Sequence, residues 1–187
     1  MQKHKPIHLI VAQDKNSVIG HGPKVPKWGV TDDYGLNFVP KTMGCAIIMG
    51  GNTARSFKQA LEGRICIAIS RDKTLETKGF IVVDNLWEAL AIAHKAAGDI
   101  VWICGGDQIY QLALKHLVIE ELHITTIEAS YPADNAIMFS GFDSNLYEID
   151  LSQSVYFEKR QPKTIDEKDK GNKESARVEV YKYNPAA

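Results

Sequence analysis

The stretch CAIIMGGNT, residues 45–53, combines a short, continuously apolar run with two glycines and the polar start of a helical pattern. A short apolar run that ends in glycine is typical of a strand covered on both of its faces. The polar residues after the glycines begin a pattern that predicts a helix over 53–61. The stretch therefore predicts a strand that turns directly into a helix, which is the unit from which parallel sheets are built.

Similar apolar runs recur along the chain and predict about eight strands. The predicted strands cover 7–12, 45–49, 65–69, 80–83, 100–104, 122–127, 147–157 and 178–183. The other helical patterns cover 31–38, 85–97 and 107–117, which makes four helices with 53–61. Strand and helix alternate through the first two thirds, so we expect an α/β fold whose mostly parallel sheet carries helices on both faces.

The helical segments have recognisable ends and faces. Thr31 is placed to cap the first helix and Pro40 to stop it. The third helix should bury its apolar side and end before Gly98. The residues that we expect to face a core are Leu86, Leu90 and Ala93 in the third helix and Ile109, Leu112 and Ala113 in the fourth.

The last third of the chain lacks helical patterns. Its two predicted strands flank a segment over 159–177 that is rich in Lys, Asp and Glu. We therefore expect an antiparallel C-terminal hairpin with a long charged loop, which is most simply a solvated loop. The whole chain, 1–187, is expected to form one domain.

Composition restricts the class of protein. The 187 residues are 44% hydrophobic and 24% charged with a net charge of −1, so bulk charge favours neither a nucleic-acid nor a membrane partner. Cys45, Cys66 and Cys104 each lie in an apolar run, which predicts free thiols in a reduced, cytoplasmic protein. No Cys or His spacing predicts a metal site, and no apolar run reaches the length of a signal or membrane segment.

Several local features have both a chemical and a purely structural interpretation. The loop over 20–28 could close over a ligand, and Asp32 and Asp33 could either bind a ligand or simply cap a helix. The glycine pairs at 50–51 and 105–106 could expose N–H groups to a phosphate or could form tight turns. Arg64 could clamp a carboxylate or remain a surface charge.

Taken together and in this order, the motifs resemble the dihydrofolate reductase family over nearly the whole chain. The matching pieces are 9–12, 18–20, Pro26 with Trp28, Asp33, 48–50, 63–64, 104–106 with Tyr110, and 124–125 with Asp134. The resemblance implies an NADPH-dependent oxidoreductase that reduces 7,8-dihydrofolate to tetrahydrofolate by hydride transfer, in support of one-carbon and thymidylate metabolism. It implies dihydrofolate as a small-molecule substrate, NADPH as the cofactor and no metal; we expect a monomer.

The resemblance also implies roles for individual residues. Asp33 would pair with the amide and amino groups of the pterin, Thr125 would hydrogen-bond Asp33, and Trp28 would lie near the water that brings the proton. The implied substrate-binding residues are Ile10, Val11, Ala12, Asp33, Tyr34, Phe38, Phe57, Leu61, Arg64, Cys104, Tyr110 and Thr125. The implied cofactor-binding residues are Ala12, Ile19, Gly20, Gly50, Gly51, Asn52, Thr53, Ser70, Arg71, Cys104, Gly105, Gly106, Asp107, Gln108, Ile109 and Tyr110, with a cis peptide between Gly105 and Gly106.

The sequence departs from the family pattern in two main places. Gly51 stands where the family often has a basic residue for the cofactor's 2′-phosphate, so Arg71 or Arg55 would have to supply that charge. The spacing from Asp33 to Phe38 is one residue longer than usual, which predicts a bulge or a shifted register in the first helix, with Asp32 as the alternative carboxylate.

Smaller departures are Lys27, which looks inserted in the loop, and Cys104, which replaces a branched aliphatic residue. The sequence leaves two alternative functions open. One is a riboflavin-pathway reductase, whose substrate would not need Asp33 together with Arg64. The other is a catalytically silent module of the same fold that binds a nucleotide or a partner.

Overall fold

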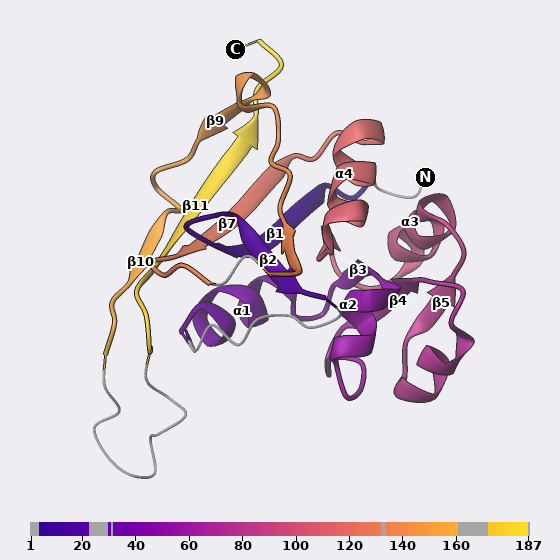
Figure 1. Ribbon diagram of the computed structural model, residues 1–187. Coiled ribbons are helices and arrows are strands. Elements are labelled where there is room, and N and C mark those ends of the chain that lie inside the picture. Colours follow the sequence, from indigo (N-terminus) through magenta and orange to yellow (C-terminus); the bar gives the residue numbers. More distant parts are fainter. Residues whose placement is uncertain (1–3, 23–29, 31, 132–133, 161–171, 187) are drawn as a thin grey trace.

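The computed structural model describes residues 4–22, 30, 32–131, 134–160 and 172–186. The strands of its main sheet are β1 (Ile7–Asp14), β3 (Ala46–Gly50), β4 (Ile65–Ile69), β5 (Ile81–Val83), β6 (Val101–Ile103), β7 (Glu121–Ile127), β9 (Tyr147–Ile149), β10 (Val155–Phe157) and β11 (Ala176–Tyr183). They lie in the order β10-β11-β7-β1-β6-β3-β4-β5, and β9 also pairs with β11 (Figure 1).

The central part of the sheet is parallel. β1 lies between β6 and β7, and β3 lies between β6 and β4, all in parallel pairs. The C-terminal strand β11 is antiparallel to β7, β9 and β10. The predicted fold class, a mostly parallel sheet with an antiparallel C-terminal hairpin, is therefore confirmed.

The strand predicted over 147–157 is wrong as a single element. A turn over 150–154 divides 147–157 into β9 and β10. At this turn the Asp150 side chain accepts a hydrogen bond from the Ser152 N–H (3.0 Å), and the Asp150 carbonyl accepts one from the Gln153 N–H (3.2 Å). A side chain that satisfies turn backbone in this way competes with strand pairing, and apolar periodicity gives no sign of it.

A second sheet has two strands that the sequence did not predict, β2 (Val18–His21) and β8 (Ala136–Met138). They pair antiparallel with an irregular register between Val18 and Gly20. Both strands are short, and their partners are far apart along the chain, so neither produces a clear alternating pattern.

The helices are α1 (Val39–Thr42), α2 (Gly51–Ser56), α3 (Leu86–Lys95) and α4 (Asp107–His116), the π-helix η1 (Asp33–Phe38), and the 3₁₀ helices η2 (Lys73–Lys78) and η3 (Ser144–Leu146). They cover both faces of the sheet, because alternate strand side chains point to opposite sides. On β1, Leu9 packs into the core cluster that contains α3 and α4, whereas Ile10 packs into the cluster that contains Ala54 of α2 and Leu75 of η2.

The two long helices follow the predicted pattern closely. Leu86, Leu90 and Ala93 of α3 are buried, as are Ile109 and Ala113 of α4. Asn85 caps α3 by accepting a hydrogen bond from the Glu88 N–H at 3.0 Å.

The prediction that Leu112 of α4 faces the core is wrong, because Leu112 is 37% exposed. Tyr110 takes the buried position on this helix instead.

The first helix confirms the predicted irregularity. Residues 33–38 form a π-helix, in which the Val39 N–H donates to the Tyr34 carbonyl five residues earlier. The extra residue is absorbed in this wide turn, and the chain then continues into α1.

The prediction that Pro40 stops this helix is wrong. Pro40 is the second residue of α1, a position that tolerates proline, and the helix ends after Thr42. Thr31, the predicted cap, lies outside the described residues.

The second helix ends five residues before its predicted end at 61. Phe57 is extended, with φ −89° and ψ 143°, and its carbonyl accepts a hydrogen bond from Lys78 Nζ at 3.0 Å. Lys78 belongs to η2, so a distant cation satisfies the carbonyl that the helix leaves open.

Among the described residues, none of the helices has both the length and the apolar character that crossing a membrane requires. Cys45, Cys66 and Cys104 are free thiols, as the apolar runs around them predicted.

We expect Gly98→Ala to destabilise the fold by about 2–3 kcal/mol. Gly98 has φ +87°, and a Cβ there would lie 2.7 Å from the Gly44 carbonyl oxygen and 2.9 Å from the Cys45 Cα. Gly141→Ala is the matched control, because Gly141 has φ +83° and open space around the added carbon. Urea unfolding should show the larger loss for Gly98→Ala, and equal losses would contradict a steric contribution.

Candidate active site

Two adjoining cavities lie where the central parallel strands end. The first has a volume of about 440 Å³ and the second about 880 Å³. Ile19, Thr53 and Gly106 line both of them, so the two cavities are contiguous. The carboxyl edge of a parallel sheet is where such folds bind their ligands.

The first cavity has mostly apolar walls with one carboxylate. Its lining residues are Ile10, Val11, Ala12, Ile19, Val30, Asp33, Tyr34, Phe38, Met49, Thr53, Phe57, Cys104, Gly105, Gly106, Tyr110 and Thr125. Ten of the twelve predicted substrate-binding residues are in this set, all except Leu61 and Arg64. A flat apolar ligand with a few polar groups would suit such a cavity.

Asp33 supplies the carboxylate, and two neighbours hold it in place. Thr125 Oγ1 on β7 donates a hydrogen bond to Asp33 Oδ1 at 2.7 Å, as the sequence predicted. Asn37 Nδ2 donates to the same oxygen at 2.9 Å. Among the described residues, no group hydrogen-bonds Asp33 Oδ2, so this oxygen is available to a ligand.

The environment of Asp33 also changes its acidity. Burial raises the pKa of the Asp33 carboxyl, although the hydrogen bonds from Asn37 and Thr125 act in the opposite direction. Burial disfavours the ionised form because it removes the water that would hydrogen-bond the carboxylate. A ligand that donates two N–H groups would replace these hydrogen bonds.

Asn37 is the functional neighbour that sequence reasoning missed. It is buried at 4% exposure, and its amide lies 2.9 Å from Asp33 Oδ1 and 3.4 Å from Thr125 Oγ1. The only signal in the sequence was the lengthened spacing of the first helix, since it is the π-turn that contains both Asp33 and Asn37. Val30 and Met49 were also missed as lining residues.

Asp32, the alternative carboxylate, faces the C-terminal hairpin instead. It forms an ion pair with Arg160 and accepts a hydrogen bond from Asn172 Nδ2 at 2.9 Å. Its backbone N–H donates to Asn172 Oδ1 at 3.1 Å. Asp33, not Asp32, is therefore the carboxylate of the cavity.

The junction between β6 and α4 borders both cavities, because Gly105 lines the first and Gly106 lines both. The peptide between Gly105 and Gly106 is cis, as predicted. The Gly50 N–H donates to the Gly105 carbonyl at 2.6 Å, and the Tyr110 hydroxyl donates to the Ile10 carbonyl at 2.8 Å. These bonds join the junction to the end of β3 and to the middle of β1.

The second cavity is lined by glycines, by polar and charged side chains and by several apolar ones. Its lining residues are Ile19, Gly20, Gly22, Gly50, Gly51, Asn52, Thr53, Arg55, Ile69, Ser70, Arg71, Asp84, Gly106, Asp107, Gln108, Ile109, Ala136, Ile137, Met138 and Ser140. The predicted cofactor-binding residues all line one cavity or the other. β8, Asp84 and Ser140 were not predicted, because folding alone brings them here.

Gly51 has a steric reason to lack a side chain. A Cβ at this position would lie 2.5 Å from Ser70 Oγ and 2.9 Å from Ser70 Cβ, so a larger residue would displace the end of β4. The cavity obtains its positive charge from Arg55 and Arg71.

The two arginines differ in the ion pairs and hydrogen bonds that they form within the described residues. Arg55 Nη1 lies 3.1 Å from Asp72 Oδ2, and Arg55 also hydrogen-bonds Asn52. Arg71 is exposed and forms no ion pair within the described part of the chain, so its charge is available to a ligand.

Leu61 and Arg64, two predicted substrate contacts, do not line either cavity. Arg64 lies behind Phe38, with its guanidinium carbon 5.6 Å from the centre of that ring. Its Nε donates to Thr42 Oγ1 at 2.8 Å and its Nη1 to the Glu62 carbonyl at 3.0 Å. Its buried Nη2 has no partner within the described residues.

Part of the predicted site lies outside the described residues. This holds for Trp28, the predicted neighbour of the proton-donating water, and for Pro23, Pro26 and Lys27 of the same loop. The predicted closing movement of the loop over 20–28 therefore stays a prediction.

Comparison with known proteins agrees with this geometry. The family model described as dihydrofolate reductase matches residues 6–170. The dihydrofolate reductase of Staphylococcus haemolyticus is 30% identical over 154 residues, which cover 82% of this chain and 88% of that one. That of Mycobacterium tuberculosis (strain ATCC 25618 / H37Rv) is 32% identical over 131 residues, which cover 68% and 75%.

A solved structure is similar over almost the full length. The dihydrofolate reductase from Enterococcus faecalis complexed with NADP(H) and RAB-propyl superposes with a TM-score of 0.76 at 25% identity, covering 96% of each chain. With a family match over most of its length and the same fold, the chain belongs to the dihydrofolate reductase family.

Proposed function

We propose that this chain catalyses the NADPH-dependent reduction of 7,8-dihydrofolate to tetrahydrofolate. The observation that carries the proposal is the Asp33 carboxylate, held by Thr125 and Asn37 in an otherwise apolar cavity. A second, glycine-lined cavity adjoins the first, so a dinucleotide and a pterin could lie against each other. Membership of the dihydrofolate reductase family supports the same reaction.

Asp33 would orient the pterin. Its free Oδ2 and the shared Oδ1 can accept two parallel N–H groups from the ring amide and the exocyclic amino group. The apolar walls strengthen this interaction, because they exclude water from the carboxylate. Held in this way, Asp33 would raise the basicity of the ring nitrogen that gains a proton.

The second cavity fits a phosphorylated dinucleotide in its chemistry. Gly51 lets the chain lie against Ser70, and Arg71 presents an uncommitted positive charge. When bound, NADPH supplies the hydride. Ile19, Gly106 and Thr53, shared by the two cavities, would hold the reacting rings in contact.

Arg64 would bind the glutamate carboxylate of the substrate. Phe38 lines the cavity and lies against the guanidinium, so a ligand tail that passes Phe38 reaches the unpartnered Nη2. Leu61 packs beside Phe38 and Phe57 in the same core cluster and would cover the apolar part of that tail. A planar guanidinium suits this task because it can hold both carboxylate oxygens.

The alternative functions have weaker support. A riboflavin-pathway reductase would have no use for a carboxylate that Thr125 and Asn37 hold at the pterin position. The silent module drew its support from the long first helix and from Gly51. The π-turn leaves Asp33 in the cavity, and Gly51 is explained by Ser70, so neither feature argues against catalysis.

We also propose that the protein acts as one domain and as a cytoplasmic monomer without a nucleic-acid or membrane partner. One chain provides both cavities, so no second copy is needed to complete them. The net charge of −1 offers no general attraction to nucleic acid or to an anionic membrane.

Asp33→Asn should lower kcat/KM for dihydrofolate about 100-fold or more, because the charge that polarises the pterin is lost. Asp32→Asn is the matched control, since Asp32 interacts with Arg160 and Asn172 outside the cavity. Turnover is followed by the loss of NADPH absorbance. Equal losses in both variants, or no turnover in the wild type, would refute the assignment.

Asp33→Asn should also make the protein more stable at neutral pH. Burial raises the folded-state pKa of Asp33. Its buried charge therefore lowers the stability of the folded protein, and this loss is fully present above that pKa. As pH falls toward the unfolded-state pKa, the wild type recovers this stability and the difference from Asp33→Asn narrows. Thermal unfolding between pH 8 and pH 4 measures it; a wild type more stable than the variant at pH 8 would contradict the burial argument.

Arg71→Ala should raise KM for NADPH about tenfold and leave KM for NADH unchanged, because only NADPH carries the 2′-phosphate. Arg55→Ala should have the smaller effect, since Arg55 is already paired with Asp72. Steady-state kinetics with both cofactors separate the two. A larger effect of Arg55→Ala would assign the phosphate contact to Arg55 instead.

A further inference from the structure

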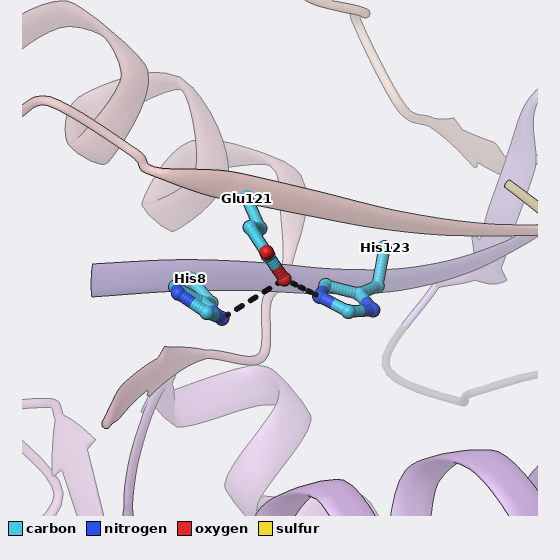
Figure 2. A group of neighbouring side chains, drawn as sticks. All are labelled: His8, Glu121 and His123. Atoms are coloured by element: carbon cyan, nitrogen blue, oxygen red, sulfur yellow. Dashed lines mark hydrogen bonds and ion pairs between the residues drawn. The ribbon is translucent and has the colours of Figure 1, made fainter. Parts of the chain in front are cut away.

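Two histidines and a glutamate converge at the starting ends of β1 and β7 (Figure 2). His8 and Glu121 are direct neighbours in the parallel pairing, and His123 follows Glu121 on the same face of β7. This end of the strands is opposite the end that carries the cavities, and neither cavity is lined by any of the three residues. The proposed reduction therefore gives this cluster no role.

The three side chains present their ligand atoms to one point. Glu121 Oε2 lies 2.9 Å from His123 Nε2 and 3.6 Å from His8 Nδ1. One ligand atom from each residue lies within 4.8 Å of the others. Around a tetrahedral ion with bonds of about 2.0–2.2 Å, ligand atoms stand roughly 3–4 Å apart, so small side-chain rotations would complete the geometry.

The cluster also contains buried nitrogen atoms that the protein leaves without partners. His8 is 8% exposed and His123 1% exposed. Within the described residues, His8 Nδ1 has no hydrogen-bond partner, although it faces Glu121 Oε2 at a distance too long for a hydrogen bond. An ion between these two atoms would bond to both of them.

The surroundings of both histidines favour the neutral imidazole. Burial lowers the pKa of His8 and of His123, and the positive charge of Lys41 lowers both further, while Glu121 acts in the opposite direction. Neutral imidazole is the ligand form. His123 Nε2 donates its hydrogen to Glu121 Oε2 at 2.9 Å, so the ion would replace this hydrogen bond and the proton would move to His123 Nδ1, which has no partner within the described residues.

Charged groups surround the cluster on several elements. Lys41 of α1 and Glu120 interact electrostatically with the histidines. Lys182 of β11 faces Glu121 but is paired with Asp150 at 2.8 Å. Gln153 Nε2 donates to Glu121 Oε1 at 3.4 Å, so the ion would bind Oε2 in place of the hydrogen bond from His123.

We infer that His8, Glu121 and His123 form a binding site for one divalent transition-metal ion of the zinc type. Two imidazoles and one carboxylate match zinc, whereas Mg²⁺ and Ca²⁺ require oxygen ligands. The fourth position would hold water on the side of Glu121, whose side chain is 19% exposed. The ion would join the first residues of β1 and β7 and so stabilise the centre of the sheet.

The first test is calorimetric titration of the chelator-treated full chain with Zn²⁺ and with Mg²⁺ at pH 7.5. We expect one Zn²⁺ per chain with a Kd of about 1 μM or tighter, and no Mg²⁺ binding. Zn²⁺ should raise the melting temperature, and its affinity should fall as pH is lowered and the histidines gain protons. Absence of Zn²⁺ binding, or equal binding of Mg²⁺, would overturn the inference.

Variants locate the ion. Glu121→Gln and His8→Asn should each weaken Zn²⁺ binding about tenfold or more and abolish the rise in melting temperature. His94→Asn is the matched control, because His94 forms a second histidine pair with His4, with ring centres 5.5 Å apart. Glu121→Gln changes little in shape, so circular dichroism should show that it folds.

Binding that survives Glu121→Gln and His8→Asn, or that is lost in His94→Asn, would place the ion elsewhere and refute the site. Co²⁺ provides an independent readout of the ligand atoms. Its absorption should show nitrogen and oxygen ligands; a thiolate charge-transfer band would assign the ion to the cysteines and overturn the proposal.

Discussion

A carboxylate inside an apolar cavity requires donors that hold it, and the hydrogen bond from Thr125 to Asp33 meets this requirement. The bond joins the central strand β7 to the π-helix, so the position of the helix and the position of the carboxylate depend on each other. Asn37 completes the arrangement from within the same helix. The site therefore rests on a link between two elements that lie far apart in the sequence.

The parallel sheet provides the second constraint. Because β1, β3 and β6 end at one edge, the side chains and glycines that follow them meet there. The first cavity has large apolar walls around one carboxylate, and the second is lined by glycine backbone and arginine. Residues shared by the two cavities would place a ligand in one beside a ligand in the other, which hydride transfer between two rings requires.

The same strands present different chemistry at their two ends. On β7, His123 and Thr125 lie on one face, because side chains two residues apart point the same way. Thr125 supports the carboxylate of the cavity, whereas His123 belongs to the buried cluster with His8 and Glu121. On this face of β7, Glu121, His123 and Thr125 therefore follow one another, and Ile10 of β1 pairs with His123 and packs into the core cluster on that side.

The sequence by itself determined where most strands of the main sheet lie along the chain, the two long helices and the free thiols, and through its resemblance to a known family the cis junction and most of the cavity walls. These features depend on local periodicity or on motifs whose residues are close together. It also contained the irregular first helix, as one extra residue before Phe38. Only the tertiary structure decided that Asp33 and not Asp32 faces the cavity, that Asn37 supports it, and that Ser70 requires Gly51.

The tertiary structure likewise decided the division of the predicted strand 147–157, the early end of α2, the small second sheet and the histidine cluster. Each depends on contacts between residues that are distant in the chain, such as Lys78 with Phe57 or His8 with Glu121. Periodicity reports which face of an element is buried, but it carries no information about which distant side chain lies opposite that face.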